Sequence, residues 1–173
     1  MAEGTGDVAA EDEFVLPRVP ASAGALIFDR RGRLLILKPT YKSGWTIPGG
    51  VMEDDGETPW QACQREVCEE CGLDVSRARL VCMDFRLWRD GNPGGIRFLF
   101  DCGALTDSAL AGVALQPEEI SEHRLVPVAE ALTLLRAPIR RRVNAVRKRN
   151  GAPRKHAIVY LENGRRVREV RPR

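Results

Sequence analysis

Three glutamates near the middle of the chain have a spacing that can hold a metal ion. Glu69 and Glu70 follow Glu66 by three and four residues. At about 100° per residue, a helix places all three within about 100° on one face. Carboxylates this close repel one another unless a cation lies between them. Their oxygens suit Mg²⁺, with Mn²⁺ as an alternative. Taken alone, however, the pattern also fits a solvated acidic face.

An apolar stripe beside these glutamates predicts that the helix exists and has one buried face. Trp60, Cys63, Val67 and Cys71 are spaced three, four and four residues apart, which is the period of an amphipathic helix. Two of the five cysteines therefore act as small core residues. The odd cysteine count and the lack of a second Cys/His pair also argue against disulfides or a zinc site.

The ends of this helix are marked in the sequence. Thr58 is a good N-cap, Pro59 suits the first helical position, and Gln61 can complete a capping box. Gly72 is placed to end the helix.

The segment around the helix resembles the Nudix box, G-x5-E-x7-R-E-U-x-E-E-x-G-U, where U is a bulky apolar residue. The chain reads GVMEDDGETPWQACQREVCEECGL from Gly50. Glu57 is followed by seven residues and then Arg65–Leu73, and this half matches at every fixed position. The loop before Glu57 carries one extra residue, since six residues rather than five follow Gly50. An insertion in a loop costs little free energy.

The resemblance implies a metal site. Glu66, Glu69 and Glu70 match the carboxylates that hold the metal in this family, and the carbonyl of Gly49 matches a backbone ligand. Bound Mg²⁺ neutralises a diphosphate, lowers the pKa of a coordinated water and orients it. A carboxylate then accepts the proton as the water attacks phosphorus.

Two further roles follow from the same resemblance. Arg65 matches an arginine that pairs with the first glutamate of the box, here Glu57. Many members take another carboxylate from a later loop as general base or extra ligand. Glu119 is our candidate for that carboxylate, with Glu118 and Glu122 as rivals.

The candidates for substrate binding rest on residue type alone. Phe85 can stack on a base, and Lys38, Arg86 and Arg97 can meet phosphates. Each also has an ordinary structural interpretation, as a core aromatic or a surface charge.

Alternating apolar runs and turn residues predict an α/β fold, a Nudix-type α/β/α sandwich with a mixed β-sheet. We expect a polar loop over Ala109–Glu122 and helices over Val128–Leu135 and Ile139–Lys148, separated by Pro138. The other expected strands are Ala25–Asp29, Arg33–Lys38, Leu80–Trp88 and Ile96–Cys102.

A basic C-terminal helix and β-hairpin complete the predicted architecture. The hairpin pairs Ala157–Leu161 with Arg166–Val170 around an Asn-Gly turn. Residues 136–173 carry a net charge of +12 and residues 1–135 carry −9. We therefore expect three regions: a disordered acidic tail (1–17), the Nudix domain (18–137), and a basic unit (138–173) packed on that domain or on a second subunit.

The remaining composition favours a cytoplasmic protein. The N-terminal residues are acidic and lack an apolar stretch, which argues against a signal or transit peptide. No apolar run approaches the roughly 20 residues of a membrane helix.

The leading hypothesis is a Mg²⁺-dependent hydrolase that cuts a diphosphate bond in a nucleoside diphosphate-linked compound or a nucleoside triphosphate. One alternative is a hydrolase of a prenyl or inositol diphosphate. Another, from a different class, is a nucleic-acid-binding regulator on a Nudix body, contacting its ligand through the basic C-terminus. The resemblance also implies a small phosphorylated partner and allows a homodimer.

Overall fold

The computed structural model describes residues 18–89, 91, 94–150 and 157–167. The acidic tail predicted at residues 1–17 lies outside this part of the chain. Within the described residues, no helix combines the length and apolar character needed to cross a membrane.

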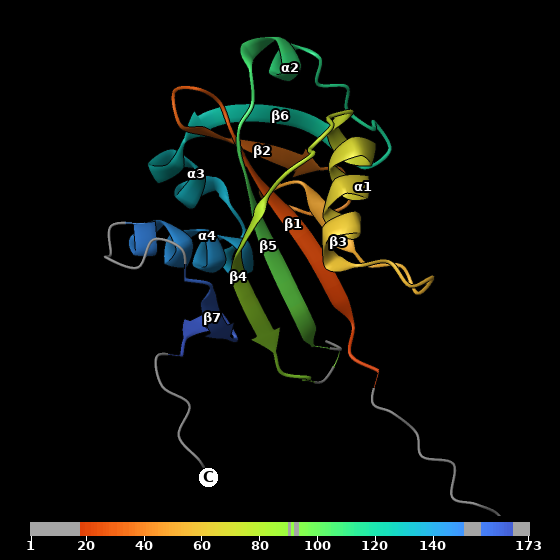
Figure 1. Cartoon of the computed structure of the whole chain (residues 1–173), viewed down its shortest axis with the longest axis vertical. Helices are drawn as coiled ribbons and strands as arrows, with labels where there is room; N and C mark the ends of the chain where they lie inside the picture. The colour runs from red at the N-terminus through yellow and green to blue at the C-terminus, as the bar shows by residue number, and fades with distance from the viewer. Residues whose placement is uncertain (1–17, 90, 92–93, 151–156, 168–173) are drawn as a thin grey trace, which may run out of the picture.

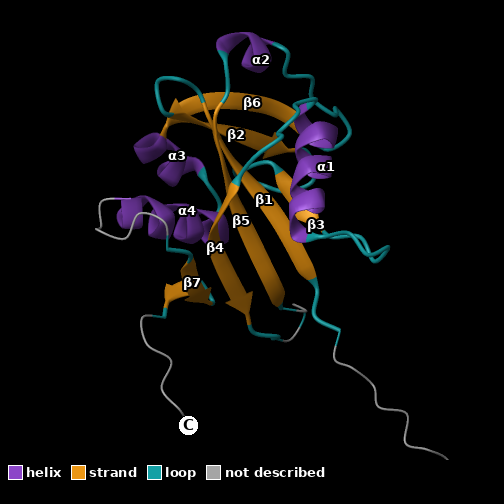
Figure 2. Cartoon of the chain, in the orientation of Figure 1, coloured by secondary structure: helices purple, strands orange, loops and turns teal. Residues whose placement is uncertain are grey.

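A single mixed sheet forms the centre of the molecule (Figures 1 and 2). Its order is β6-β2-β1-β5-β4-β7-β8, with β3 paired to β1. The pairs β1–β5 and β4–β7 are parallel, and the other pairs are antiparallel. The strands are β1 (Ala21–Phe28), β2 (Arg33–Pro39), β3 (Gly49–Val51), β4 (Arg79–Arg86), β5 (Gly95–Ala104), β6 (Ile120–Pro127), β7 (Val159–Glu162) and β8 (Arg165–Arg166).

Helices cover both faces of the sheet, and strand alternation decides which residues each helix meets. Leu35 and Leu37 of β2 join a core cluster with α1 (Pro59–Cys71). Leu34 and Ile36 point the other way, into a cluster with α3 (Val128–Leu134) and α4 (Ala137–Asn150). Figure 1 shows α1 on one side of the strands and α3 and α4 on the other. The predicted α/β/α sandwich is therefore confirmed.

Helix α1 has the ends that the sequence predicts. Thr58 Oγ1 accepts a hydrogen bond from the Gln61 N–H, and the Gln61 side chain accepts one from the Thr58 N–H. Gly72 ends the helix with φ at 64°, a left-handed conformation that favours glycine. Cys63 and Cys71 lie in the core as predicted, and all five cysteines are free thiols.

The region predicted as a polar loop over Ala109–Glu122 is partly ordered, and this prediction is wrong at both ends. A short helix, α2 (Asp107–Ala111), begins after Thr106, whose side chain accepts a hydrogen bond from the Ala109 N–H. Leu110 is buried and holds this turn on the core.

Strand β6 (Ile120–Pro127) is the second departure from the predicted loop. It runs antiparallel to β2 and forms one edge of the sheet. Because an edge strand keeps one side in water, it tolerates charged residues such as Glu122 and Arg124. The composition of this segment is therefore typical of a loop, but its pairing with β2 makes it a strand.

The C-terminal region packs on the same chain. Val143 and Val146 of α4 and Val159 and Leu161 of β7 are buried in one cluster with the sheet. Pro138 lies in the first turn of α4, which starts two residues earlier than predicted. Strand β7 also begins two residues later than predicted, and residues 168–170 of the expected hairpin lie outside the described chain.

Candidate active site

The candidate site lies where α1 faces the start of β3. Glu70 is buried, and its Oε2 accepts a hydrogen bond of 2.8 Å from the Gly49 N–H. Gly50 lies against the Glu66 carboxylate, and a Cβ at Gly50 would stand 2.3 Å from Glu66 Oε1. A side chain at this position would therefore displace the Glu66 carboxylate. The paired glycines let two glutamates of the helix approach the backbone of the loop.

Arg65 ties the helix to the preceding loop. Its Nε donates to Glu57 Oε1 at 2.8 Å, and its Nη1 donates to Glu66 at 3.0 Å and Glu69 at 2.9 Å. Its Nη2 also donates to the Val51 carbonyl at 3.0 Å. The pairing with Glu57, the position that the box assigns, holds the loop in spite of its extra residue.

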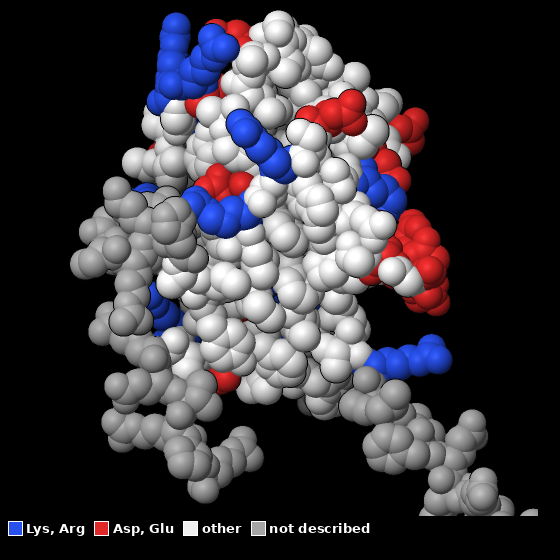
Figure 3. Space-filling view, viewed as in Figure 1, with Lys and Arg blue, Asp and Glu red and all other residues white. Residues whose placement is uncertain are grey.

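The loop before α1 adds acidic charge at the surface. Glu53, Asp54 and Asp55 are exposed there. In Figure 3, acidic side chains gather along the edge of the molecule that carries α1 and this loop. A cation would therefore be attracted to this edge from solution.

Negative charge is concentrated inside the site as well. Burial raises the pKa of Glu70 to about 7, against the Gly49 N–H, and the charges of Glu66 and Glu119 add to the effect. Burial also raises the pKa of Glu66, against the ion pair with Arg65, and the same direction is favoured by Glu69 and Glu119. The neighbouring carboxylates thus make Glu66 and Glu70 harder to ionise.

Glu119 acts on Glu66 and Glu70 from a different segment of the chain, just before β6. The Glu119 carbonyl accepts from the Thr40 N–H at 2.8 Å, and Thr40 Oγ1 donates to the Glu118 carbonyl at 2.7 Å. Its rival Glu122 is paired with Arg124 at 2.7 Å. Of the three candidate carboxylates, Glu119 is the one that raises the pKa of both Glu66 and Glu70.

The donor set fits a hard divalent cation, because every side chain involved presents carboxylate oxygen. The carboxylates are not yet gathered around one point. Glu66 and Glu69 share Arg65, while Glu70 faces the Gly49 N–H. Accordingly, no group of three or more His, Cys, Asp or Glu side chains forms a metal-holding arrangement in the part of the chain described.

A groove of about 230 Å³ runs from the Gly49–Gly50 backbone toward α4. Its floor includes Ile47, Phe98 and Leu99, and positive side chains surround it: Lys42, Arg86, Arg97, Arg136 and Arg142. The combination of an apolar floor and cationic walls suits a ligand with a flat ring and phosphate groups.

The predicted substrate residues fall in different places. Arg86 and Arg97 line the groove. Lys38 is exposed on β2, with its Nζ 6.0 Å from the centre of the Trp45 ring, and it does not line the groove. Phe85 does not line it either, and its carbonyl accepts from the Asn163 N–H.

Sequence reasoning did not single out Lys42, Arg136 or Arg142. They come from a loop, the α3–α4 connection and α4, so their convergence depends on the packing of distant segments. No local pattern marks them.

Comparison with known proteins agrees with this fold. The model of the NUDIX domain matches residues 18–146. A "MutT-like protein" of Streptomyces ambofaciens is 32% identical over 113 residues, which cover 62% of this chain and 70% of that protein. An "8-oxo-dGTP diphosphatase" of Proteus vulgaris is 40% identical over 63 residues, covering 34% of this chain and 55% of the relative.

A solved structure has the same fold. The MutT protein of Methanosarcina mazei superposes with a TM-score of 0.65 at 24% identity, over 76% of this chain and 95% of that one. The matched domain is that of enzymes that hydrolyse acid anhydrides. The chain belongs to the Nudix family of hydrolases.

Proposed function

We propose that this protein hydrolyses a diphosphate bond in a nucleotide substrate, either a nucleoside triphosphate or a nucleoside diphosphate linked to another group. The observation that carries the proposal is the contact of the Glu70 and Glu66 carboxylates with Gly49 and Gly50, whose backbone lines a cationic groove. The similarity to an 8-oxo-dGTP diphosphatase over 63 residues supports a nucleotide.

Glu66, Glu69 and Glu70 are the residues proposed to hold Mg²⁺, or Mn²⁺, together with the Gly49 carbonyl. The bound ion supplies charge neutralisation and an acidified water. Arg65 holds one oxygen of Glu66 and one of Glu69, so the second oxygen of each carboxylate can bind the ion while Arg65 keeps Glu57 and the Val51 carbonyl as partners. The loop therefore remains attached to α1 in either state.

The other residues of the chain have separate proposed roles. Glu119 accepts the proton of the attacking water, because it approaches the metal-binding face from the opposite segment and has no ion pair with a described residue. Arg86 and Arg97 hold the phosphates in the groove, and the apolar floor receives the base.

The test is a release assay over a panel of nucleotide, prenyl and inositol diphosphates with Mg²⁺. We expect hydrolysis of at least one nucleotide, dependence on the metal, and loss of activity on addition of a chelator. Glu119→Gln should lower kcat by about 10² or more while Mg²⁺ binding persists. Hydrolysis confined to a prenyl or inositol compound would contradict the proposed substrate.

A further inference from the structure

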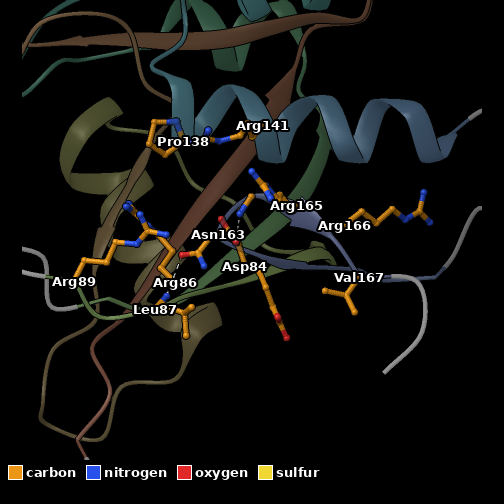
Figure 4. Close-up of a pocket in the computed structure, with 12 residues that line it drawn as sticks. Asp84, Arg86, Leu87, Arg89, Pro138, Arg141, Asn163, Arg165, Arg166 and Val167 are labelled. Carbon is orange, nitrogen blue, oxygen red and sulfur yellow. Dashed lines mark hydrogen bonds between the residues drawn. The ribbon is translucent and has the colours of Figure 1, made fainter. Parts of the chain in front are cut away.

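A second, larger hollow of about 550 Å³ lies between α4, the end of β4 and the β7–β8 hairpin (Figure 4). We call it the arginine pocket, because five arginines line it: Arg86, Arg89, Arg141, Arg165 and Arg166. Its carboxylates are Asp84 and Glu162. Asp84 is already satisfied, since it accepts from Arg142 at 3.0 Å and from the Gly164 N–H at 2.9 Å. The pocket therefore carries a large excess of positive charge.

The five arginines have no anionic partner in the part of the chain that the structure describes. Within the described residues, none of them forms an ion pair with a carboxylate. In Figure 4, Arg141 descends from α4 while Arg165 rises from the hairpin, and Arg86 and Arg89 come from the chain at and after the end of β4. A guanidinium presents a planar set of donors that matches phosphate oxygens.

Positive charge here is crowded enough to affect neighbouring groups. Burial lowers the pKa of Arg97, and the charges of Arg142 and Arg86 lower it further. Burial also lowers the pKa of the partly buried Arg142, against the attraction of Asp84, and the charge of Arg86 adds to the lowering. A bound anion would relieve this repulsion.

The exposed side chain of Arg141 lies against the turn of the hairpin. Its Nε would lie 2.9 Å from a Cβ built on Gly164, where φ is +74°. The turn of the hairpin therefore needs glycine for its conformation, and Arg141 lines the pocket beside it.

The arginine pocket adjoins the groove of the candidate active site. The two share Arg86 and Pro138 as lining residues. On its other side, a third hollow of about 440 Å³ shares Arg141 and Arg166 with it and adds Lys148. A cationic strip thus leads from Gly49–Gly50 past the start of α4 to its middle.

The hairpin that closes the pocket lies beyond the matched family domain, which ends at residue 146. Residues 159–167 supply half of its lining, from Glu162 to Val167. The pocket therefore depends on a part of this chain that the family domain does not include.

We propose that the arginine pocket is a second phosphate-binding site, which holds phosphate groups of the substrate that are remote from the bond being cut. Its identity as a substrate site rests on the proposed function, whereas phosphate binding does not. The strip favours a ligand with several phosphates in succession. Such phosphates occur in a compact oligophosphate chain and in the 5′ end of an oligonucleotide.

Binding is tested first without catalysis. Inorganic tripolyphosphate is titrated into the full-length protein in a chelator, so that no catalytic metal contributes. We expect saturable binding, weakened at least tenfold by the double variant Arg141→Gln/Arg165→Gln. Both residues are exposed and make no ion pair with a described carboxylate, so the fold should be retained. The matched control is Arg30→Gln/Arg31→Gln, which removes two exposed arginines from the β1–β2 turn.

Two results would overturn the proposal: wild-type affinity in the Arg141/Arg165 variant, or an equal loss of affinity in the Arg30/Arg31 control. The second would mean that binding follows overall charge rather than this pocket.

The source of the phosphates is then identified by competition and kinetics. If a single-stranded 5′-triphosphorylated oligonucleotide displaces tripolyphosphate, we expect its KM to rise about tenfold more in the Arg141/Arg165 variant than the KM of a nucleoside triphosphate. If it does not compete, the ligand is a compact oligophosphate. Absence of any nucleotide hydrolysis by the wild type would refute the proposed function but leave the binding result intact.

Discussion

Glu70 is a buried carboxylate, and two other carboxylates, those of Glu66 and Glu119, are close enough to act on its charge. Its side chain reaches Gly49 and is almost removed from solvent. Burying a carboxylate disfavours its charged form, and nearby negative charge adds to the penalty. Groups held in such a state are typical of functional sites rather than of structural ones. This residue therefore offers the sharpest tests of the metal site.

We expect Glu70→Gln to keep the fold and reduce kcat by about 10² or more, because a charged ligand is lost where the ion must be held. Glu66→Gln should behave similarly. Steady-state kinetics at limiting Mg²⁺ measures the effect, and Glu130→Gln, an exposed glutamate of α3, is the matched control. Near-normal rates in both site variants would show that the metal lies elsewhere.

The raised pKa of Glu70 predicts how stability changes with pH in the metal-free protein. The folded pKa is about 7 and the ordinary value is 4.5, so between these values the folded state binds more protons than the unfolded state. Stability is therefore greatest below about pH 4.5 for this group, and it falls as the pH rises through 7. The loss is on the order of 3 kcal/mol.

Chemical denaturation between pH 5 and pH 8, in a chelator, measures this effect. We expect Glu70→Gln to be more stable than the wild type at pH 8 and to show a smaller fall across the range. Added Mg²⁺ should stabilise the wild type at pH 8 more than the variant. Parallel pH profiles for the two proteins would contradict the inferred environment of Glu70.

Among the elements, β4 connects the helical layer to the C-terminal hairpin. Asp84 of β4 is buried, pairs with Arg142 of α4 at 3.0 Å, and accepts the Gly164 N–H of the hairpin turn. The Asp84 carboxylate thus accepts hydrogen bonds from both α4 and the hairpin turn. A buried pair of this kind matters because removing one partner leaves the other charge without compensation.

We expect Asp84→Ala to lower the free energy of unfolding by about 3 kcal/mol, since Arg142 would remain buried and unpaired. Thermal and denaturant unfolding measure the loss. The double variant Asp84→Ala/Arg142→Met should recover part of it, because the uncompensated charge is then absent. If the double variant is less stable by the sum of the single effects, the two residues are not coupled.

At the scale of the whole molecule, the basic C-terminal region is an integral part of the sheet. Strand β7 runs parallel to β4, and the side chains of Val159 and Leu161 are fully buried. The predicted attraction between a basic end and an acidic body is compatible with this arrangement, although the buried apolar side chains provide the larger stabilisation, about 1.5–3 kcal/mol each.

A chain that ends at Asn150 should therefore unfold several degrees below the full-length protein, because β4 loses its partner β7 and Val159 and Leu161 no longer cover the core. A chain that ends at Val167 keeps β7 and β8 and is the matched control. The exposed edge of β4 should also promote self-association, which light scattering detects. Equal melting temperatures and masses for both truncations would show that the region contributes nothing to the folded unit.

Features that depend on neighbouring residues were determined by the sequence. The capping box at Thr58, the terminal glycine at Gly72 and the apolar stripe through Cys63 define α1 within about one residue. The Asn163–Gly164 turn is equally local, with φ values of 51° and 74°. The box motif adds the order of the glutamates and hence the class of chemistry.

Only the tertiary structure decided which distant side chains meet. Asp84 is 58 residues from Arg142 and 80 from Gly164, and Thr40 is 78 from Glu118. These contacts follow from the strand order, which brings β4 beside β7 and β2 beside β6. The cationic groove and the arginine pocket likewise collect arginines from separate elements. Since charged surface residues carry no periodic signal of their own, a linear pattern cannot show which of them will face a common space.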